Sequence, residues 1–267
     1  MWSYRHAGFT VHQLPALNDN YIYLIESQDH QGKEGAVAVI DPAEAAPVEA
    51  ACSELGLSPT HVLNTHHHWD HTGANLELKE RYGCQIVGAR SDAARIPGID
   101  IMVDEDSGFT LGSLPVRVLE VPGHTRGHIA YVITDALFCG DTLFGGGCGR
   151  LFEGSPAQMW ESLQKLARLP AATRVYCAHE YTLSNLRFAR TVDADNPALA
   201  ERISRDTRTR MDNMPTIPST IGLELATNPF LRPLSPSFCT AYAATAAGTA
   251  GEALAVFTDI RARKDKA

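Results

Sequence analysis

The sequence predicts an α/β domain followed by a helical region, and three observations support this fold class. Up to about residue 180, short apolar runs of β-type composition alternate with helix-like stretches. From about Asn185 onward the pattern is helical and is interrupted at prolines, first at Pro197. The 267 residues suffice for one large domain, or for a medium domain with a smaller appendage. We therefore expect an α/β domain at 1–182 and a helical domain at 183–267.

The individual elements follow from the composition of each stretch. The predicted strands are 11–17, 21–27, 35–41, the beginning of 61–68, 84–89, 115–123, 128–141 and 174–180. The first two flank the turn residues Asn18, Asp19 and Asn20, and the stretch 128–141 is a pair of strands joined by a Thr-Asp turn. The predicted helices of the first domain are 43–55, 73–83 and 155–169. The last of these begins with a Ser N-cap and a Pro at the first helical position.

Charge and hydrophobicity exclude several classes of protein. The chain has 23 Lys and Arg against 31 Asp and Glu, a formal net charge of −8, so a broad nucleic-acid surface is not expected. No run approaches the roughly 18–20 consecutive apolar residues of a transmembrane helix. The N-terminal MWSYRHAGFT has no apolar core behind a basic start, so we expect no signal peptide. Six scattered cysteines without a CxxC pair indicate reduced, mostly buried thiols. We expect a cytoplasmic monomer without a membrane partner.

Four histidines fall within six positions in the segment NTHHHWDHTGAN, residues 64–75. In extended backbone, side chains alternate between faces, so His66 and His68 point the same way and can bind one metal ion. Asp70 and His71 follow where the chain turns toward a helix, and they can reach a second ion. Imidazole and carboxylate suit Zn, Fe or Mn. Two ligands do not bind an ion well, so the remaining ligands have to come from elsewhere in the chain.

Three further ligand-type residues follow apolar runs: His124 in VPGHTRGH, Asp141 in LFCGDTLF and His179 in VYCAHEYT. Function in layered α/β proteins gathers at strand ends. Each residue alone has an ordinary structural interpretation, as a turn histidine, a helix N-cap or a hydrogen-bonded semi-buried ring. Together with the histidine cluster they predict one dinuclear metal site. His128 is the best candidate for a residue that supports the ligands.

With these residues in hand, the chain resembles the metallo-β-lactamase superfamily, whose signature is HxHxDH. Within it the chain is most similar to the glyoxalase II, or hydroxyacylglutathione hydrolase, family. The resemblance runs almost end to end. The motifs that carry it are DNYIYLI, THHHWDH, PGHTRGH, GDTLFGGGCGRLFEG, AHEYT, NPFLR and IRARKD.

The resemblance implies a four-layer αββα sandwich with two metal ions, most often zinc, followed by a helical substrate-binding domain. It implies that His66, His68 and His124 hold the first ion. Asp70, His71 and His179 would hold the second, and Asp141 would bridge both. Glutathione would be bound by Arg150, Tyr181, Arg261 and Lys264. Phe152 stands where some members have a substrate-contacting tyrosine, so a hydroxyl contact is not expected there.

The expected reaction is hydrolysis of the thioester S-D-lactoylglutathione by a metal-bridging hydroxide, with Asp70 and Asp141 in the catalytic group. This would be the second step of methylglyoxal detoxification. Metal binding lowers the pKa of water from about 15.7 to about 7. The leaving thiol has a pKa of about 8.5, so no general acid is required. The sequence has no GxSxG nucleophile motif, and Cys148 is interpreted as structural. The basic tail, Arg261 to Lys266, fits the two carboxylates of glutathione.

Other interpretations remain open from the residues alone. A glutathione persulfide dioxygenase of the same fold would hold one iron, and the complete second ligand set argues against it. A lactonase would not explain the basic tail. A nuclease of this fold would need a basic surface that a net charge of −8 does not suggest. A non-catalytic metal-binding protein would favour a closed site of four Cys or His ligands.

Overall fold

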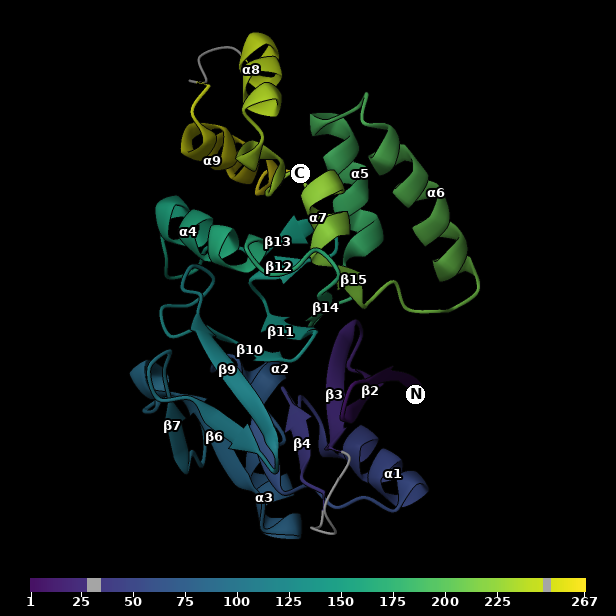
Figure 1. The fold of residues 1–267 in the computed structure, drawn as a ribbon, viewed down its shortest axis with the longest axis vertical. Helices are drawn as coiled ribbons and strands as arrows, with labels where there is room; N and C mark the ends of the chain where they lie inside the picture. Colours follow the sequence, from purple (N-terminus) through teal and green to yellow (C-terminus); the bar gives the residue numbers. More distant parts are fainter. Residues whose placement is uncertain (28–34, 247–250) are drawn as a thin grey trace. The chain divides into compact units, whose positions relative to one another are not determined.

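The computed structural model of the chain describes residues 1–27, 35–246 and 251–267. These residues form two compact units, and the chain passes from one unit to the other more than once (Figure 1). The first unit contains residues 1–120 and 126–140, and the second contains 121–125 and 141–267. Across the described residues, no helix combines the length and the apolar character that crossing a membrane requires.

The first unit contains a seven-stranded sheet in which spatial order follows sequence order. Its strands are β1 (Trp2–His6), β2 (Phe9–Ala16), β3 (Asn20–Ser27), β4 (Val37–Ile40), β5 (His61–Leu63), β6 (Gln85–Ala89) and β7 (Ile101–Val103). Strands β1 to β4 pair antiparallel, whereas β4 to β7 pair parallel. Parallel neighbours have their carboxyl ends at one edge, so β4 and β5 bring the residues that follow them to the same edge.

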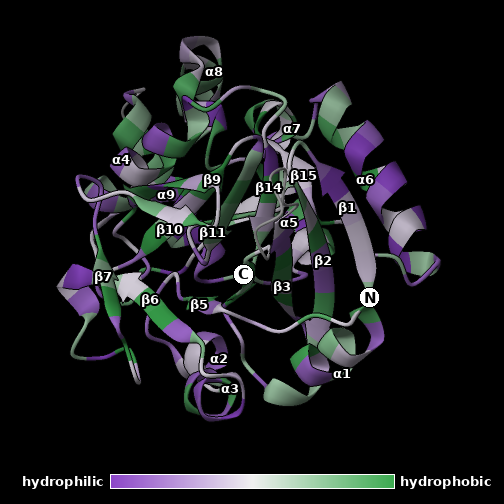
Figure 2. Ribbon diagram, turned by 60° about the horizontal axis from the view of Figure 1, so that its bottom comes forward, coloured by the Kyte–Doolittle hydropathy of each residue, from purple (hydrophilic) through white to green (hydrophobic). Residues whose placement is uncertain are grey.

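Two helices cover one face of this sheet. They are α1 (Ala45–Leu55) and α3 (Asn75–Tyr82), and they lie together below the sheet in Figure 1. Val48 of α1 and Leu78 of α3 are fully buried with Val39 of β4 in one apolar cluster. Apolar area removed from water, at about 25 cal/mol per Å², is what fixes the helices on the sheet. Figure 2 shows the strands β3 and β6 as mostly hydrophobic, as expected for strands buried on both faces.

The first unit also contains four antiparallel strands of a second sheet, in the order β8–β9–β10–β11. They are β8 (Phe109–Leu111), β9 (Leu114–Glu120), β10 (Ile129–Ile133) and β11 (Ala136–Gly140). Tyr131 of β10 is fully buried, and its hydroxyl donates to the carbonyl of Asn64 at 2.9 Å. Because Asn64 directly follows β5, this bond connects β10 to the histidine-rich segment. Burial raises the pKa of Tyr131 well above its ordinary value, so the hydroxyl stays protonated and can donate.

Between the strands of the first unit lie two short helices, α2 (Trp69–Thr72) and the 3₁₀ helix η1 (Arg90–Asp92). The predicted helix 73–83 corresponds to α3, and the one-turn helix α2 before it was not predicted. Gly73 separates the two, and a Cβ there would collide with the carbonyl oxygen of Ala43. The close approach of two backbones therefore fixes the position of α2.

The second unit is mainly helical. Its helices are α4 (Pro156–Ala167), α5 (Thr182–Val192), α6 (Pro197–Met211), α7 (Ile221–Thr227), the 3₁₀ helix η2 (Arg232–Leu234), α8 (Pro236–Thr245) and α9 (Ala253–Lys264). Its strands are β12 (Leu143–Phe144), β13 (Gly147–Cys148), β14 (Arg174–Cys177) and β15 (Ser219–Thr220). Helices α5 and α6 lie side by side in Figure 1, with Leu186, Ala189 and Leu199 buried between them.

Helix starts in the second unit agree with the sequence signals. At α4, the Ser155 side chain accepts from the backbone of Gln158, and the Gln158 side chain accepts from the backbone of Ser155, a complete capping box. The prolines at 197 and 236 are the first residues of α6 and α8, after Asn196 and Ser235 caps. The prediction treated them as interruptions of helices, and the structure places them at helix starts.

Candidate metal centre

In the first unit, four ligand-type residues lie just after β5. His66 and His68 come before α2, and α2 itself contains Asp70 and His71. The Nε2 atom of His66 lies 3.0 Å from Nδ1 of His68. The Nε2 atom of His71 lies 3.5 Å from Oδ2 of Asp70. The four residues therefore form two pairs, as their spacing predicted.

Asp41 fixes this segment in place. It directly follows β4, has a positive φ of 50°, and is buried. Its Oδ1 accepts from the backbone N–H of Thr65 at 2.8 Å, and its Oδ2 accepts from the Thr65 hydroxyl at 2.7 Å. The same Oδ2 lies 3.0 Å from Nδ1 of His71. A proton on Nδ1 leaves the lone pair of His71 on Nε2, the atom near Asp70, where a metal ligand needs it.

Two more polar contacts support the same segment. Asn20, the first residue of β3, donates from Nδ2 to Oδ2 of Asp70 at 3.1 Å and to the Asp70 carbonyl at 3.2 Å. The ring of His128 stacks on that of His66 with centroids 4.5 Å apart. His128 was expected to support the ligands, and the stacking agrees. The contributions of Asn20 and Asp41 were not predicted, although Asp41 ends an apolar run just as the ligands do.

In the second unit, one carboxylate lies between two imidazoles. Oδ2 of Asp141 is 3.3 Å from Nε2 of His124, and Oδ1 of Asp141 is 3.3 Å from Nε2 of His179. All three residues are buried. Each oxygen of Asp141 thus pairs with a different histidine, which is the arrangement of a carboxylate that bridges two ions.

The loop that carries His124 is fixed by the segment 150–154. Nδ1 of His124 donates to the carbonyl of Arg150 at 2.8 Å, because a carbonyl can only accept. That bond leaves the lone pair on Nε2, which faces Asp141. Phe152 N–H donates to the His124 carbonyl at 3.3 Å, and Gly154 N–H donates to the Gly123 carbonyl at 3.0 Å. A Cβ on Gly154 would lie 2.6 Å from the Cα of Gly123, so this approach requires glycine.

The distances between these atoms suit metal ligands. Two atoms bound to one ion at about 2.0–2.1 Å in tetrahedral geometry are about 3.3 Å apart. The pairs His124–Asp141 and His179–Asp141 match that separation. Nitrogen and carboxylate oxygen are donors that zinc, iron and manganese accept. The donor set therefore fits a pair of divalent ions.

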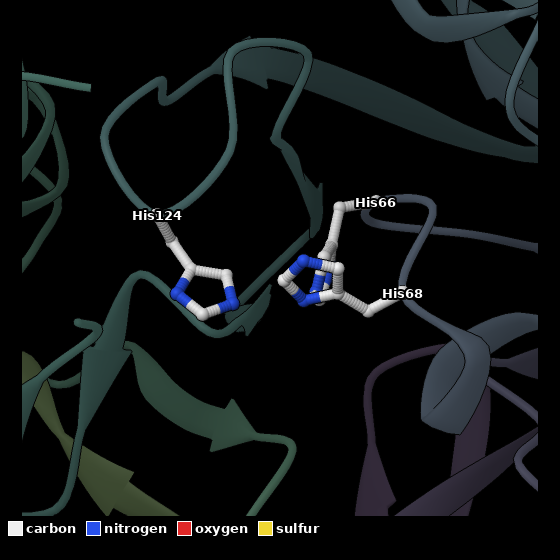
Figure 3. Close-up of side chains that lie close together, drawn as sticks. All are labelled: His66, His68 and His124. Atoms are coloured by element: carbon white, nitrogen blue, oxygen red, sulfur yellow. The ribbon is translucent and has the colours of Figure 1, made fainter. Parts of the chain in front are cut away.

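The ligand-type residues form three groups, and within each group the possible ligand atoms lie within 4.8 Å of one another. The groups are His66, His68 and His124; His66, His71 and Asp141; and Asp70, His71 and His179. Figure 3 shows the first group, with the three imidazole rings turned toward one another. These groups include all seven residues that the sequence singled out as ligands.

The residues expected to contact the substrate lie in the second unit. Arg150 and Phe152 are exposed, and the Phe152 ring lies 5.1 Å from that of His124. Tyr181 is exposed, and its ring stacks on that of His179 with centroids 4.7 Å apart. Lys264 is half-buried, and its Nζ lies 5.2 Å from the centroid of the Phe188 ring.

Arg261 differs from the other predicted substrate contacts because only 5% of it is exposed. Its Nη1 donates to the carbonyl of Cys148 at 3.1 Å, and its Nη2 pairs with Asp265 at 2.8 Å. Its guanidinium also lies 4.9 Å from the centroid of the Phe230 ring. The helical pattern placed Arg261 and Lys264 on one face of α9, whereas the structure gives Arg261 a buried position.

Several positively charged side chains lie near Lys264. Burial is the main cause that lowers the pKa of its ammonium, and the neighbouring Arg261, Arg187 and Arg150 lower it further. The pKa of the nearby Cys148 thiol is raised instead of lowered. Burial raises the pKa of Cys148 to about 11, against a smaller opposing effect of Arg261. Cys148 is therefore not a thiolate at neutral pH, in agreement with its structural interpretation.

Comparison with known proteins assigns most of the chain to known families. Residues 17–179 match the family described as the metallo-beta-lactamase superfamily, and residues 180–267 match the hydroxyacylglutathione hydrolase C-terminus. A hydroxyacylglutathione hydrolase of Methylococcus capsulatus is 52% identical over 95% of this chain and 96% of its own. That of Rhodospirillum rubrum is 50% identical over 96% of this chain and 97% of its own. The solved structure of TTHA1623 in a di-iron-bound form is 27% identical, with a TM-score of 0.57, over 83% of this chain and 99% of its own.

Proposed function

The chain belongs to the hydroxyacylglutathione hydrolase family of the metallo-β-lactamase superfamily, and on that basis we propose how its residues carry out the reaction. It is a metal-dependent thioester hydrolase that acts on S-lactoylglutathione. We propose the D-lactoyl thioester and related 2-hydroxyacyl thioesters as its substrates, with glutathione and the free hydroxy acid as products. The match of residues 180–267 to the hydroxyacylglutathione hydrolase C-terminus favours this assignment over the dioxygenase alternative.

We propose that the seven ligands bind two divalent ions. His66, His68 and His124 would hold one ion, Asp70, His71 and His179 would hold the other, and Asp141 would bridge them. Zinc is the first choice, and iron or manganese would suit the same donors. When bound, the ions would lower the pKa of a coordinated water to about 7 and polarise the thioester carbonyl. The support is the pairing of each Asp141 oxygen with a different histidine.

The chain's own residues would orient this centre. Asp41 fixes the tautomer of His71, and the carbonyl of Arg150 fixes that of His124. Asn20 orients Asp70, which would align the attacking water. A thiol has a pKa of about 8.5, so the leaving group can depart as thiolate without a proton from the protein. Since Cys148 and Cys177 are buried thiols with pKa values of about 11 and about 12, the chain does not supply a cysteine nucleophile from these positions.

We propose that the two carboxylates of the glutathione moiety bind cations of the second unit. Arg150 is an exposed cation and Lys264 a half-buried one, and Tyr181 can donate a hydrogen bond from an exposed position. Phe152 can contact the substrate only through its ring. Arg261 would contact the glutathione moiety from its buried position. The division into a catalytic domain at 1–182 and a substrate-binding domain at 183–267 remains part of the same proposal.

The decisive experiment combines elemental analysis with a thioester assay on one preparation. We expect about two metals per chain and hydrolysis of S-D-lactoylglutathione, both abolished by a chelator. Asp141→Ala should lose metal and activity together, with a fall in kcat/KM of more than about 100-fold, because it removes the ligand proposed to be common to both ions. One iron per chain with oxygen consumption on glutathione persulfide would instead identify a dioxygenase.

A further inference from the structure

A cavity of about 610 Å³ lies against α5 and the end of α9. Figure 1 shows the end of the chain, after α9, beside α5. The α5 residues that line the cavity occupy positions three or four apart, so they form one face of the helix. The lining residues are Ser184, Arg187, Phe188, Thr191, Arg263, Lys264, Lys266 and Ala267.

The charge of this cavity is unusual for the chain. The whole sequence has a formal net charge of −8, whereas four Arg or Lys side chains and no acidic side chain line the cavity in the described structure. Arg187 is close enough to Lys264 to help lower its pKa. Like charges gathered in this way repel one another, and a bound anion relieves the repulsion.

The arginines of the cavity differ in their partners. Arg263 is engaged: its Nη1 donates to the Tyr242 hydroxyl at 2.7 Å, and its Nη2 donates to the Thr191 carbonyl at 3.4 Å. Arg187 is exposed, and its guanidinium makes no hydrogen bond or ion pair with residues 1–27, 35–246 or 251–267. Beside it, Phe188 is buried and supports the Nζ of Lys264. Arg187 and Lys264 therefore both line the same cavity, with the ring of Phe188 next to Lys264.

We propose that Arg187 is a specificity-determining residue that, with Lys264, binds one carboxylate of the glutathione moiety in this cavity. The proposal rests on the proposed function and adds a residue to it. A guanidinium can donate two parallel hydrogen bonds to a carboxylate, and the ammonium of Lys264 supplies a second charge. The Ser184 hydroxyl, on the same face of α5, is available as a further donor.

The test compares Arg187→Ala and Arg187→Lys with Arg190→Ala. Arg190 is the matched control, because it is an exposed arginine of the same helix that does not line the cavity. With S-D-lactoylglutathione, Arg187→Ala should raise KM about tenfold, as expected for the loss of a charge-assisted hydrogen bond, and change kcat less than twofold. Arg187→Lys should lie between this variant and the unchanged enzyme, and Arg190→Ala should resemble the unchanged enzyme.

A second substrate separates recognition of the carboxylate from damage to the fold. The D-lactoyl thioester of N-acetylcysteamine contains no carboxylate, so the kcat/KM of every variant should equal that of the unchanged enzyme. An equal loss on both thioesters would assign Arg187 a structural role. An unchanged KM for S-D-lactoylglutathione in Arg187→Ala would also overturn the proposal.

Calorimetry with free glutathione distinguishes this proposal from the proposed function. If the unchanged protein binds glutathione but does not hydrolyse the thioester, the proposed function fails and the role of Arg187 is judged from binding alone. Arg187→Ala should then raise the Kd for glutathione about tenfold, and Arg190→Ala should leave it unchanged. Equal Kd values for the two variants, or no glutathione binding by the unchanged protein, would refute the proposal.

Discussion

At the scale of single residues, Asp41 has the clearest effect on the metal centre without being a ligand itself. Its two oxygens accept from the backbone and hydroxyl of Thr65, and one of them also faces Nδ1 of His71. The carboxylate thereby fixes both the path of the histidine segment and the tautomer of one ligand. Loss of its charge should weaken metal binding while leaving all seven ligands present.

We predict that Asp41→Asn lowers the affinity for metal about 10- to 100-fold, the usual effect of removing such a partner. The measurement is competition with a chromogenic chelator. Asp135→Asn is the control, since Asp135 is a half-exposed carboxylate that pairs with His6. Equal affinity in the two variants would show that Thr65 and His71 are oriented without Asp41.

Among individual residues, the sequence singled out the proposed ligands but not the residues that support them. His124, Asp141 and His179 each follow an apolar run, so their positions at strand ends could be inferred. Asp41 follows one as well, but an Asp before a proline resembles a turn, and its role depends on a partner 24 residues away. The burial of Arg261 could not be inferred either, because its acceptor is a backbone carbonyl 113 residues away.

At the scale of elements, the hairpin of β12 and β13 is fixed by a buried polar network from α6 and α7. Glu224 of α7 is completely buried, and its Oε2 accepts from the backbone N–H of Gly146, in the turn of the hairpin, at 2.9 Å. Its Oε1 pairs with the buried Arg202 of α6 at 2.7 Å. Asn228 donates to the carbonyls of Phe144 and Gly147, one on each strand. The hairpin lies between Asp141 and Arg150 in the chain, so this network helps to position both.

We predict that Glu224→Ala destabilises the protein by about 3–5 kcal/mol, because it leaves Arg202 buried without its closest carboxylate. Glu201→Ala is the control, and at its exposed position on α6 it should change stability by less than about 0.5 kcal/mol. Urea unfolding of both variants measures the difference. A loss below about 1 kcal/mol for Glu224→Ala would mean that Asp206 alone compensates Arg202.

The hairpin also shows which elements the sequence does not reveal. The run GGGCG has no alternation of apolar and polar residues, so the pattern predicted no strand there. The short strands β1, β7, β8 and β15 were missed as well. In contrast, α1, α4 and the β2–β3 hairpin were predicted within a few residues, because helical composition, a Ser N-cap followed by Pro, and turn residues are local signals.

At the scale of the whole molecule, the predicted metallo-β-lactamase fold with a C-terminal helical region is confirmed by the two family matches. The end-to-end set of motifs, rather than any single motif, is what allowed this prediction. The proposed role of Arg187 was not predicted from the sequence. A lone cation on a helix usually indicates a solvated face, and only packing of α5 against α9 brings it near Lys264.

All six cysteines are free thiols and buried, and this has a measurable consequence. Burial raises the pKa of Cys52 to about 11, of Cys148 to about 11 and of Cys177 to about 12. At pH 8, only about one in a thousand of the Cys52 and Cys148 thiols would then be the reactive thiolate. We predict that iodoacetamide at pH 8 labels none of the six in the native protein within an hour. After unfolding in urea it should label all six, and mass spectrometry gives the count. Rapid labelling of Cys148 in the native protein would contradict this account.

The bond from His124 to residue 150 uses a main-chain oxygen, which every amino acid possesses. If the Arg150 side chain binds glutathione as proposed, replacing it would therefore weaken substrate binding while leaving the hydrogen bond that orients the imidazole intact. Recognition and ion binding are in this way separable at a single position. A substitution at residue 150 could then change substrate recognition without loss of ion binding.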